Sequence, residues 1–553
     1  MRYRCSILYV IGISFGFAVA YSAQCDAAER SETNAYEAFA LTHAGDAERG
    51  RELYFNEKLT KCGICHKLDG KGGDAGPDLS AIGGKFDRPH LIESLLEPSR
   101  QIVEGFRSSI VSLKSGKVQT GVIKDRTGNT MTLVDVNGEA RTIEISDIDQ
   151  QQETDVSLMP FGLEKLLTLD EFADLIAFLE TCRTGIKGTP GSHISGGISL
   201  PDAFQIETIA TGLTGATAME ATADGRILIC EQTGALRVVR DEQVLPVPVL
   251  TLPVEAWWER GLIGVTINPD FPNTPYIYVC YVAKDPYPHH RISRFTMLGD
   301  VADPDSEKLL LAGDDQTTLG GKVPAGHQGG ALHFGPDGKL YIAIGEQTAG
   351  LPSQHLDTFQ GKLLRINSDG SIPDDNPFNS QTTGKYRAIW AIGLRNPFTF
   401  AFQPSTGKMY INDIGGNKFE EINLGLVGAN YGWPLAEGPS DDQSFSSPIH
   451  WYKAASACGA AFVPDHADWP EELRGRYIFA DYIHGWIKTL DLNDPQNAHP
   501  FIAGLRNPVD LRFVSDGSLY ILIRNAWVLD EKFPTGTGSL LKISPKNSGG
   551  DAD

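Results

Sequence analysis

The sequence lacks an excess of positive charge. It has only 48 lysine and arginine residues but 70 aspartate and glutamate residues, which gives a formal net charge of −22. A protein that binds a polyanion needs a basic face to release counterions, so the composition argues against nucleic acid as a partner. With 41% hydrophobic and 21% charged residues among 553, the composition excludes both a multi-span membrane protein and a wholly disordered chain.

Long hydrophobic runs are also scarce. The run over residues 7–20 follows two arginines and is too short to span a hydrocarbon core of about 30 Å. It predicts a secretory signal peptide over residues 1–23, with an uncleaved anchor as the alternative. We therefore expect an exported, periplasmic protein with no transmembrane span in its mature form. Lipid anchoring at Cys25 is disfavoured, because Gln24 does not suit lipidation.

Cysteines are few, and most show no metal-ligand spacing. Cys182, Cys230, Cys280 and Cys458 stand singly, so buried thiols and one disulfide both stay open.

Cys62 and Cys65 differ, because Cys62-Gly63-Ile64-Cys65-His66 is the C-x-x-C-H pattern of covalent c-type haem attachment. Two thiols one helical turn apart bond to the haem vinyl groups, and the adjacent imidazole reaches the iron. A redox C-x-x-C pair or half of a zinc site is the alternative, but no second cysteine pair or distal histidine pair completes a tetrahedral site.

Three residues are candidates for the second axial iron ligand. Met159 is the first choice, because it lies in a loop before a predicted helix and a thioether ligand suits haem. Met131 alternates with polar neighbours like a buried strand residue. His90 is the third candidate and is expected on the surface of a helix.

Short elements surround these residues. Helices are predicted over residues 49–59 and 169–182. Alternating strands with hairpin turns between them are predicted over residues 109–113, 118–123, 130–136 and 140–145.

The order of these features resembles a bacterial haem-binding cytochrome c family. It runs from C-x-x-C-H through Gly76-Pro77-Asp78-Leu79 and a β insert to Met159-Pro160, within residues 45–183. Members of this family are commonly fused to propeller-like sugar dehydrogenase domains. The resemblance implies a small, mostly α domain that carries covalent haem c, with His66 and Met159 on the iron.

From residue 204 onward, one turn-and-strand pattern recurs six times without helical periodicity. Its turns are Asp224-Gly225, Thr274-Pro275, Asp337-Gly338, Thr406-Gly407, Arg474-Gly475 and Asp516-Gly517. Six irregular copies over some 300 residues predict a six-bladed β-propeller over residues 204–545, reached through a linker over residues 184–203. A pair of β-sandwiches is the alternative. The predicted fold class is thus multidomain: a mostly α cytochrome c domain with a β insert, then an all-β propeller.

Loops that break the repeat are the place to look for function. They include Gly326-His327-Gln328-Gly329-Gly330, Leu394-Arg395-Asn396-Pro397, and Asn430-Tyr431-Gly432-Trp433-Pro434. With these motifs the sequence is similar to soluble quinoprotein aldose dehydrogenases, which use pyrroloquinoline quinone (PQQ).

The resemblance implies a role for each matching residue. His327 falls at the general base that removes the sugar hydroxyl proton while hydride leaves for the quinone. Arg395 falls where a guanidinium contacts the quinone oxygens. Asn396 falls at a cofactor hydrogen-bonding position. From the residues alone, the alternatives are a tight-turn histidine whose ring caps a backbone carbonyl and a structural arginine that closes an ion pair between blades.

The resemblance also implies calcium. The carbonyls of Gly415 and Gly416 fall where the family holds the ion that polarises PQQ, although a simple turn is the alternative. Glu421 and the Tyr431 carbonyl fall at a second, structural calcium. Oxygen ligands of this kind suit calcium.

Two departures from the family pattern stand out. Gly326 replaces an aspartate before the general base. The stretch over residues 458–463 lacks the lysine that pairs with a PQQ carboxylate, and Arg506 or Arg512 is the candidate substitute.

Two functions follow. The first is an exported quinohaemoprotein oxidoreductase that oxidises an aldose or related alcohol with PQQ. It passes the electrons to its haem c and then to an external acceptor such as another cytochrome. The alternative is an electron-transfer cytochrome c whose propeller is a non-catalytic scaffold that binds a glycan or a partner.

Overall fold

The computed structural model describes residues 35–68, 71–80, 82–86, 88–100, 102, 106–126, 130–154, 156–182, 193–194, 198–319, 325–453, 455–465, 468–526 and 536–546. The predicted signal peptide, Cys25 and most of the predicted linker lie outside these residues. The chain divides into two compact units. Unit 1 comprises Met1–Gly83 and Asp87–Cys182, and unit 2 comprises Gly84–Phe86 and Arg183–Asp553. No helix in the described ranges is both long enough and apolar enough to cross a membrane.

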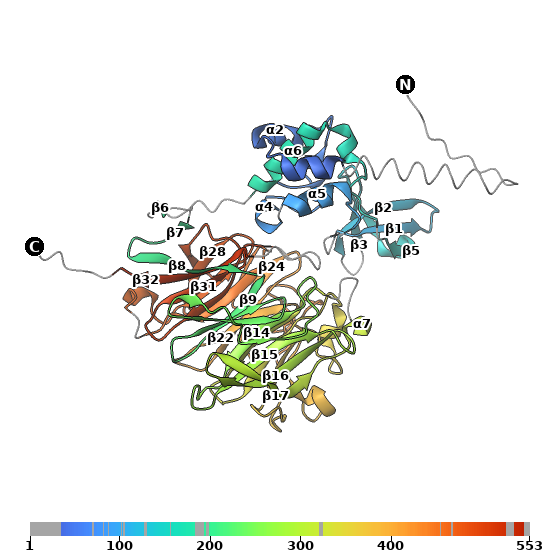
Figure 1. Ribbon diagram of the computed structural model, residues 1–553. Helices are drawn as coiled ribbons and strands as arrows, with labels where there is room; N and C mark the ends of the chain where they lie inside the picture. The colour runs from blue at the N-terminus through green and yellow to red at the C-terminus, as the bar shows by residue number, and fades with distance from the viewer. Residues whose placement is uncertain are drawn as a thin grey trace, which may run out of the picture. The chain divides into compact units, whose positions relative to one another are not determined.

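Unit 1 carries short helices before and after its sheet (Figure 1). They are α2 (Ala47–Tyr54), α3 (Cys62–Cys65), α4 (Ile82–Lys85), α5 (Arg88–Leu96) and α6 (Leu169–Thr181), with 3₁₀ turns η1 (Ile145–Asp147) and η2 (Leu163–Leu166). One of them, α4, crosses the boundary to unit 2 at Gly84. The prediction for α6 is confirmed, and a capping box between Thr168 and Glu171 begins it.

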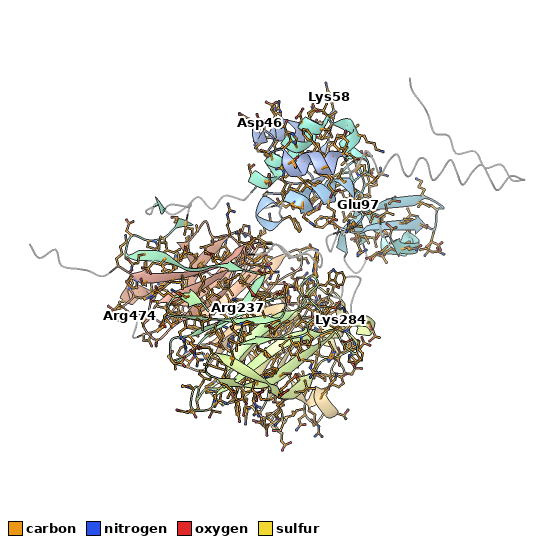
Figure 2. The ribbon with its side chains drawn as sticks, viewed as in Figure 1. Asp46, Lys58, Glu97, Arg237, Lys284 and Arg474 are labelled. Atoms are coloured by element: carbon orange, nitrogen blue, oxygen red, sulfur yellow. The ribbon has the colours of Figure 1, made fainter. Side chains whose placement is uncertain are left out.

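The first predicted helix is displaced from its predicted bounds of residues 49–59. Asp46, labelled in Figure 2, caps the backbone N–H groups of Glu48 and Arg49, so α2 begins earlier. It also ends earlier, because the Asn56 side chain accepts from the N–H groups of Lys58 and Leu59 and turns the chain.

The predicted β insert is a five-stranded sheet. Its strands are β1 (Ser108–Leu113), β2 (Val118–Arg126), β3 (Thr130–Val134), β4 (Ala140–Glu144) and β5 (Ile148–Glu153), in the order β4-β3-β2-β1-β5. The sequence Ile-Asp-Gln-Gln-Gln-Glu of β5 has no apolar alternation, so its pattern does not predict a strand. Met131 is fully buried with Val111 and Leu133, as its alternation predicts. The expectation of a surface position for His90 is wrong, because α5 buries its side chain.

Unit 2 is a six-bladed propeller, as predicted (Figure 1). The six sheets are listed here by strand. Sheet 1 has β9 (Ala216–Ala221), β10 (Ile227–Glu231), β11 (Ala235–Arg240) and β12 (Gln243–Val244), with β13 (Leu250–Thr251) also on β11. Sheet 2 has β14 (Leu262–Ile267), β15 (Tyr276–Ala283), β16 (His289–Leu298) and β17 (Val301–Ala312). Sheet 3 has β18 (Gly329–Phe334), β19 (Leu340–Ile344), β20 (Lys362–Ile366) and β21 (Ile389–Ala391). Sheet 4 has β22 (Pro397–Phe402), β23 (Met409–Asp413), β24 (Phe419–Gly425) and β25 (His450–Lys453). Sheet 5 has β26 (Ala457–Phe462), β27 (Tyr477–Asp481), β28 (Trp486–Leu490) and β29 (Ala498–Ile502). Sheet 6 has β30 (Pro508–Phe513), β31 (Leu519–Ile523), β32 (Gly538–Pro545) and β8 (Phe204–Leu213).

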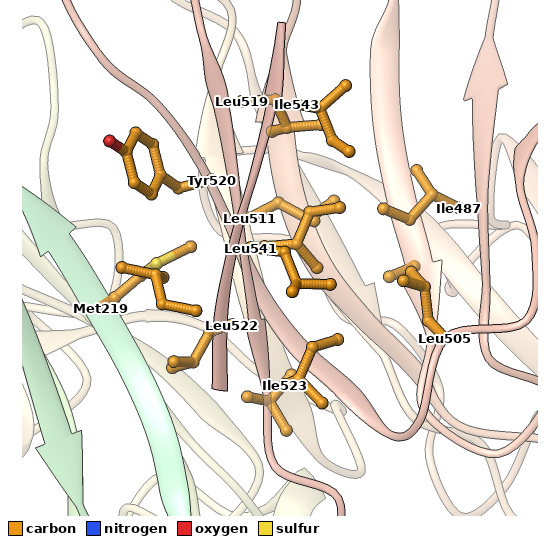
Figure 3. Close-up of a cluster of buried hydrophobic side chains, with 14 of the residues drawn as sticks. Met219, Ile487, Leu505, Leu511, Leu519, Tyr520, Leu522, Ile523, Leu541 and Ile543 are labelled. Atoms are coloured by element: carbon orange, nitrogen blue, oxygen red, sulfur yellow. The ribbon is translucent and has the colours of Figure 1, made fainter. Parts of the chain in front are cut away.

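The ring of sheets is closed. The first strands contact one another in the cycle β9, β14, β18, β22, β26, β30 and back to β9. The sixth sheet takes its outer strand, β8, from the beginning of unit 2. Buried side chains fill the spaces between sheets. Figure 3 shows Leu511, Leu519 and Leu541 of the sixth sheet facing Ile487 of the fifth.

All six predicted turns join the first strand of a sheet to its second strand. They therefore share one end of the propeller, which we call the turn end. In an antiparallel sheet, the connections before the first strand and between the second and third strands lie at the opposite end. We call this the site end, because it carries residues 326–328, 345–361, 392–396 and 414–418.

The structure decides between the two alternatives left open for the four single cysteines, buried thiols or one disulfide. Cys182, Cys230, Cys280 and Cys458 are all buried thiols that form no disulfide within the described part of the chain.

Candidate functional site

His327 and Arg395 meet at the site end. His327 precedes β18 and Arg395 precedes β22, and their atoms Nε2 and Nη2 lie 2.9 Å apart. A guanidinium can only donate, so Nε2 accepts and the imidazole proton lies on Nδ1. Arg395 also donates to the carbonyls of Ile414 (3.1 Å) and Gly415 (2.7 Å). The site thus presents a neutral imidazole next to a fixed positive charge.

Glu346, which sequence reasoning missed, completes this cluster. It lies two residues after the end of β19, its side chain is fully buried, and its carboxylate accepts from His327 Nδ1. Burial raises the pKa of Glu346, but the hydrogen bond from His327 and the charge of Arg395 outweigh it, so the pKa lies below its usual value. Its ionised carboxylate therefore fixes the imidazole tautomer and orientation. No local motif marks Glu346, because its partner lies 19 positions away.

The space next to His327 is occupied by an indole. A Cβ at Gly326 would lie 3.1 Å from Trp258 Nε1 and 3.3 Å from the Thr348 methyl group. The glycine in place of the family's aspartate therefore makes room for Trp258. Trp258, His327 and Thr348 all have positive φ angles, at 56°, 50° and 59°. Such conformations persist where surrounding structure holds them, and they gather at functional sites.

Trp433 lies next to Arg395 because the connection between β24 and β25 is long. The connection over residues 426–449 runs beside the end of β21, where Asn430 pairs in parallel with Ile392. This places the Arg395 guanidinium 5.2 Å from the centre of the Trp433 ring.

Asn396 is buried within the scaffold. Its side chain accepts from Gly329 N (3.0 Å) and donates to Glu259 (3.3 Å). The backbone N–H groups of Asn396 and Arg395 both donate to Asp413, at 2.7 and 3.0 Å. These bonds hold the β21–β22 connection rigidly against β18 and β23.

Buried acids gather around the predicted calcium residues. Burial, and then the charge of Glu421, raises the pKa of Asp413 to about 8, and burial also raises the pKa of Glu421. Asn423 Oδ1 is fully buried and accepts no hydrogen bond from the described residues. Uncompensated oxygens of this kind fit a hard cation.

The remaining predicted calcium groups are carbonyls. The Gly415 carbonyl is engaged by Arg395. The backbone at Gly415 approaches so closely that a Cβ would lie 1.6 Å from Phe419 O. Gly416 donates through its N–H to Glu437 at 2.8 Å. Tyr431 is buried, and its hydroxyl donates to Leu424 O at 2.7 Å. Within the described residues, no three His, Cys, Asp or Glu side chains converge as a metal site.

The two suggested substitutes for the missing lysine lie at different ends. Arg506 is exposed in the connection before β30, at the site end. Arg512 lies near the turn end of β30 and pairs with Asp510 (3.0 Å) and His333 (2.9 Å). Arg512 is therefore committed elsewhere, and Arg506 is the remaining candidate.

In unit 1, His66 is held by a hydrogen bond that fixes its tautomer. His66 Nδ1 lies 2.8 Å from the Pro77 carbonyl, so Nδ1 carries the proton and Nε2 keeps its lone pair. Burial lowers the pKa of His66, which keeps the ring neutral. Gly76 is required here, because a Cβ would lie 2.4 Å from the imidazole.

The two thiols before His66 lie on the short helix α3 and are partly exposed and free. Cys62 lines a small, mostly apolar cavity with Leu163, Phe172 and Leu175. Met159 is half-buried four residues before Leu163. The Cys62 thiol therefore lies against mostly apolar side chains at the wall of this cavity.

Comparison with known proteins identifies the class of unit 2. A family model for glucose/sorbosone dehydrogenases matches residues 213–527, and the chain belongs to that family.

Individual relatives agree with this assignment. The chain is 29% identical over 345 residues to aldose sugar dehydrogenase YliI of Escherichia coli. That alignment covers 58% of this chain and 87% of the relative. It is 33% identical over 315 residues to quinoprotein glucose dehydrogenase B of Acinetobacter calcoaceticus, covering 51% of this chain and 60% of the relative. Among solved structures, the apo-form of the soluble aldose sugar dehydrogenase from E. coli aligns with a TM-score of 0.53 at 27% identity. That alignment covers 62% of this chain and all of the solved chain.

Proposed function

We propose that this chain is an exported quinohaemoprotein that oxidises an aldose or related alcohol at a PQQ site. The site lies at the site end of unit 2, and the electrons pass to a haem c in unit 1 and then to an external acceptor such as another cytochrome. The observation that carries the proposal is the pairing of His327 with Arg395 at 2.9 Å, backed by the buried Glu346. Membership of the sugar dehydrogenase family supports the substrate class.

PQQ, when bound, supplies a quinone that accepts the hydride. His327 takes the hydroxyl proton at Nε2, after the Arg395 N–H that this lone pair accepts here has turned away from it. Glu346 then stabilises the resulting imidazolium through Nδ1–H, because its carboxylate is ionised and buried. Arg395 holds a positive charge at the same place and stabilises negative oxygen there. The buried surroundings strengthen each of these contacts.

PQQ carries three carboxylates, and the positive charges at the site end suit such a ligand in part. Arg395 and the exposed Arg506 are cations at the site end, whereas β26, which covers the predicted lysine position, is apolar. Because one family cation is missing, we expect this chain to bind PQQ more weakly than members that keep the lysine.

Haem c is supported by the geometry around His66 and by the C-x-x-C-H spacing. His66 would hold the iron through Nε2 and Met159 would be its second ligand, while Cys62 and Cys65 would bear the thioethers. Two observations support a calcium ion. The pKa values of Asp413 and Glu421 are raised, and Asn423 Oδ1 accepts no hydrogen bond from any described residue. We propose Glu421 and the Tyr431 carbonyl at that ion, and the Gly415 and Gly416 carbonyls near PQQ.

One experiment tests the function. The purified chain is loaded with PQQ and calcium, mixed with a panel of aldoses, and followed at the haem absorption bands. We expect sugar-dependent haem reduction that requires PQQ and disappears in His327→Ala.

A Cys62→Ser, Cys65→Ser variant separates the two units. It should still reduce an artificial dye with sugar but carry no covalent haem. If PQQ does not bind and no sugar reduces the haem, the propeller is a scaffold that binds a glycan or partner, and the proposal fails.

A further inference from the structure

A buried ammonium lies beneath the site end without any role in the proposed chemistry. Lys362 begins β20, and its side chain is fully excluded from solvent. Its Nζ donates to the carbonyls of Ser353 (2.8 Å), Pro352 (3.1 Å) and Gln360. All three carbonyls belong to the connection over residues 345–361, which we call the Glu346 loop. The three N–H groups of the ammonium are thus all used on one loop.

The carbonyls gathered by Lys362 lie against the segment that carries Arg395. The Ser353 carbonyl also accepts from Gly393 N at 3.0 Å, and Gly361 O accepts from Leu394 N at 3.2 Å. At the other end of the loop, Glu346 N donates to Arg395 O at 2.8 Å. The Glu346 loop and the Arg395 segment are therefore joined at both ends.

The same loop holds the aromatic neighbour of Arg395. The carbonyl of Trp433 accepts from Ser353 Oγ (2.5 Å) and from Gln354 Nε2 (2.7 Å). Trp433 in turn lies against the Arg395 guanidinium. Lys362 is thus connected, through one loop, to Glu346, to Arg395 and to Trp433.

We propose that Lys362 is a positioning residue for this site, whose ammonium clamps the Glu346 loop and so sets the spacing of His327 and Arg395. A buried charge is costly, and an apolar side chain of similar volume would serve packing as well or better. The ammonium offsets this cost by donating to three carbonyls, whose oxygens would otherwise repel one another. It thus does for these oxygens what a bound cation would do. The proposal rests on the proposed function of the site.

The clamp has a predictable dependence on pH. Burial lowers the pKa of Lys362 to about 7, although the charges of Asp314 and Asp357 oppose this shift. A neutral amine has two N–H donors and a lone pair, so it cannot satisfy three carbonyls. Activity should therefore fall as pH rises through about 7.

Stability should move in the opposite direction. The folded-state pKa of Lys362 lies below the ordinary lysine value of 10.5, so between about pH 7 and 10.5 the unfolded chain holds more protons. The Lys362 contribution to the free energy of unfolding then rises with pH. A lysine with only a structural role would not give falling activity together with rising stability.

The test compares Lys362→Met with Lys339→Met. Lys339 is the control, because its Nζ also donates to an oxygen, Asn367 Oδ1 at 2.7 Å, but it lies at the turn end. We expect kcat of Lys362→Met to fall about 10²-fold, with a smaller change in KM and with the pH trends of activity and stability abolished. Lys339→Met should keep kcat and both trends. A Lys362→Met protein that has a normal kcat and still loses activity as pH rises through about 7 would overturn the proposal.

A second measurement needs neither PQQ nor substrate, nor a folded variant. Hydrogen exchange of the unmodified chain, corrected for the intrinsic rate, is followed over residues 350–361 between pH 6 and 8. We expect protection of this loop to be lost as pH rises, while protection of β19 and β20 is kept. Unchanged loop protection would contradict the clamp even if the enzyme proves active. Lost protection with an inactive enzyme would support the clamp and count only against the proposed function.

Discussion

The two ends of the propeller use left-handed backbone positions in different ways. In the turns that join first strands to second strands at the turn end, these positions are glycines among the described residues, for example Gly225, Gly338 and Gly517, which adopt positive φ without cost. At the site end they include Trp258, His327, Gln347 and Thr348, each with φ between 50° and 59°. A chain selected only for folding would place glycine there too. The side chains kept at positive φ around His327 fit a place where surrounding structure holds strained positions for function. Two such side chains also occur at the turn end, Asp241 and Glu242 between β11 and β12.

Both ends also hold an imidazole between a carboxylate and a guanidinium. At the turn end His333 lies 3.7 Å from Glu220 and 2.9 Å from Arg512. This cluster is closed, because Asp510 pairs with Arg512. Burial, and then the charge of Arg512, lowers the pKa of His333. The same residue types thus form a structural cluster at one end and a candidate active site at the other.

The largest expected effect separates the two histidines. His327→Ala should lower kcat for sugar oxidation by about 10²- to 10⁴-fold, because the proton acceptor is lost. His333→Ala should leave kcat within about twofold and lower the melting temperature instead, because it opens a cavity in the core. Steady-state kinetics with thermal unfolding of both variants checks this. A comparable loss of kcat in both would remove the functional distinction between the ends.

The two arginines offer a second, smaller contrast. Arg395→Lys keeps the charge but loses the fork that reaches His327 and two carbonyls, so kcat should fall roughly tenfold or more. PQQ binding should weaken as well. Arg512→Lys should alter neither. Kinetics and a PQQ titration by absorbance distinguish the outcomes, and equal PQQ affinity in all three proteins would argue against Arg395 as a cofactor contact.

Calcium removal tests a property expected only at the site end. Without the ion, stability should fall as pH rises from about 4 to about 8, because the folded chain then holds the Asp413 proton that the unfolded chain releases. Calcium at a hundredfold excess over its Kd should add about 2.7 kcal/mol and suppress this fall. Glu421→Gln should lose the response to calcium. Melting curves with calcium or a chelator measure it, and identical curves would argue against the ion.

The smallest effect belongs to a turn glycine. Gly338 has a φ of 70°, and a Cβ added there would meet no atom of the described residues within 4 Å. Gly338→Ala should therefore cost about 1 kcal/mol of stability through backbone strain alone. Activity should be unchanged, as urea unfolding and kinetics can establish. A loss of activity would mean that the turn end communicates with the site.

This contrast explains what the sequence can and cannot predict. Each Asp-Gly-type turn is a local signal, so the six sheets are predicted correctly, as are α6 and four strands of the insert. The prediction for His90 is wrong because the packing of α5 is not visible in its own sequence. Glu346, Trp258 and Asn423 escape prediction because their roles come from partners brought together by different sheets. His327 and Arg395 are named only through family motifs, and their contact is a product of the closed ring.

The closure of that ring has a consequence for synthesis. Leu213 pairs with Gly538, 538 − 213 = 325 positions later, so β8 has no partner until the final strand has been made. Long-range pairing of this kind forms late in folding. A prematurely terminated chain would carry unit 1 intact but leave the ring open, and the spacing between blades would not be fixed. The proposed site is therefore completed only in chains that have been made at least as far as β32.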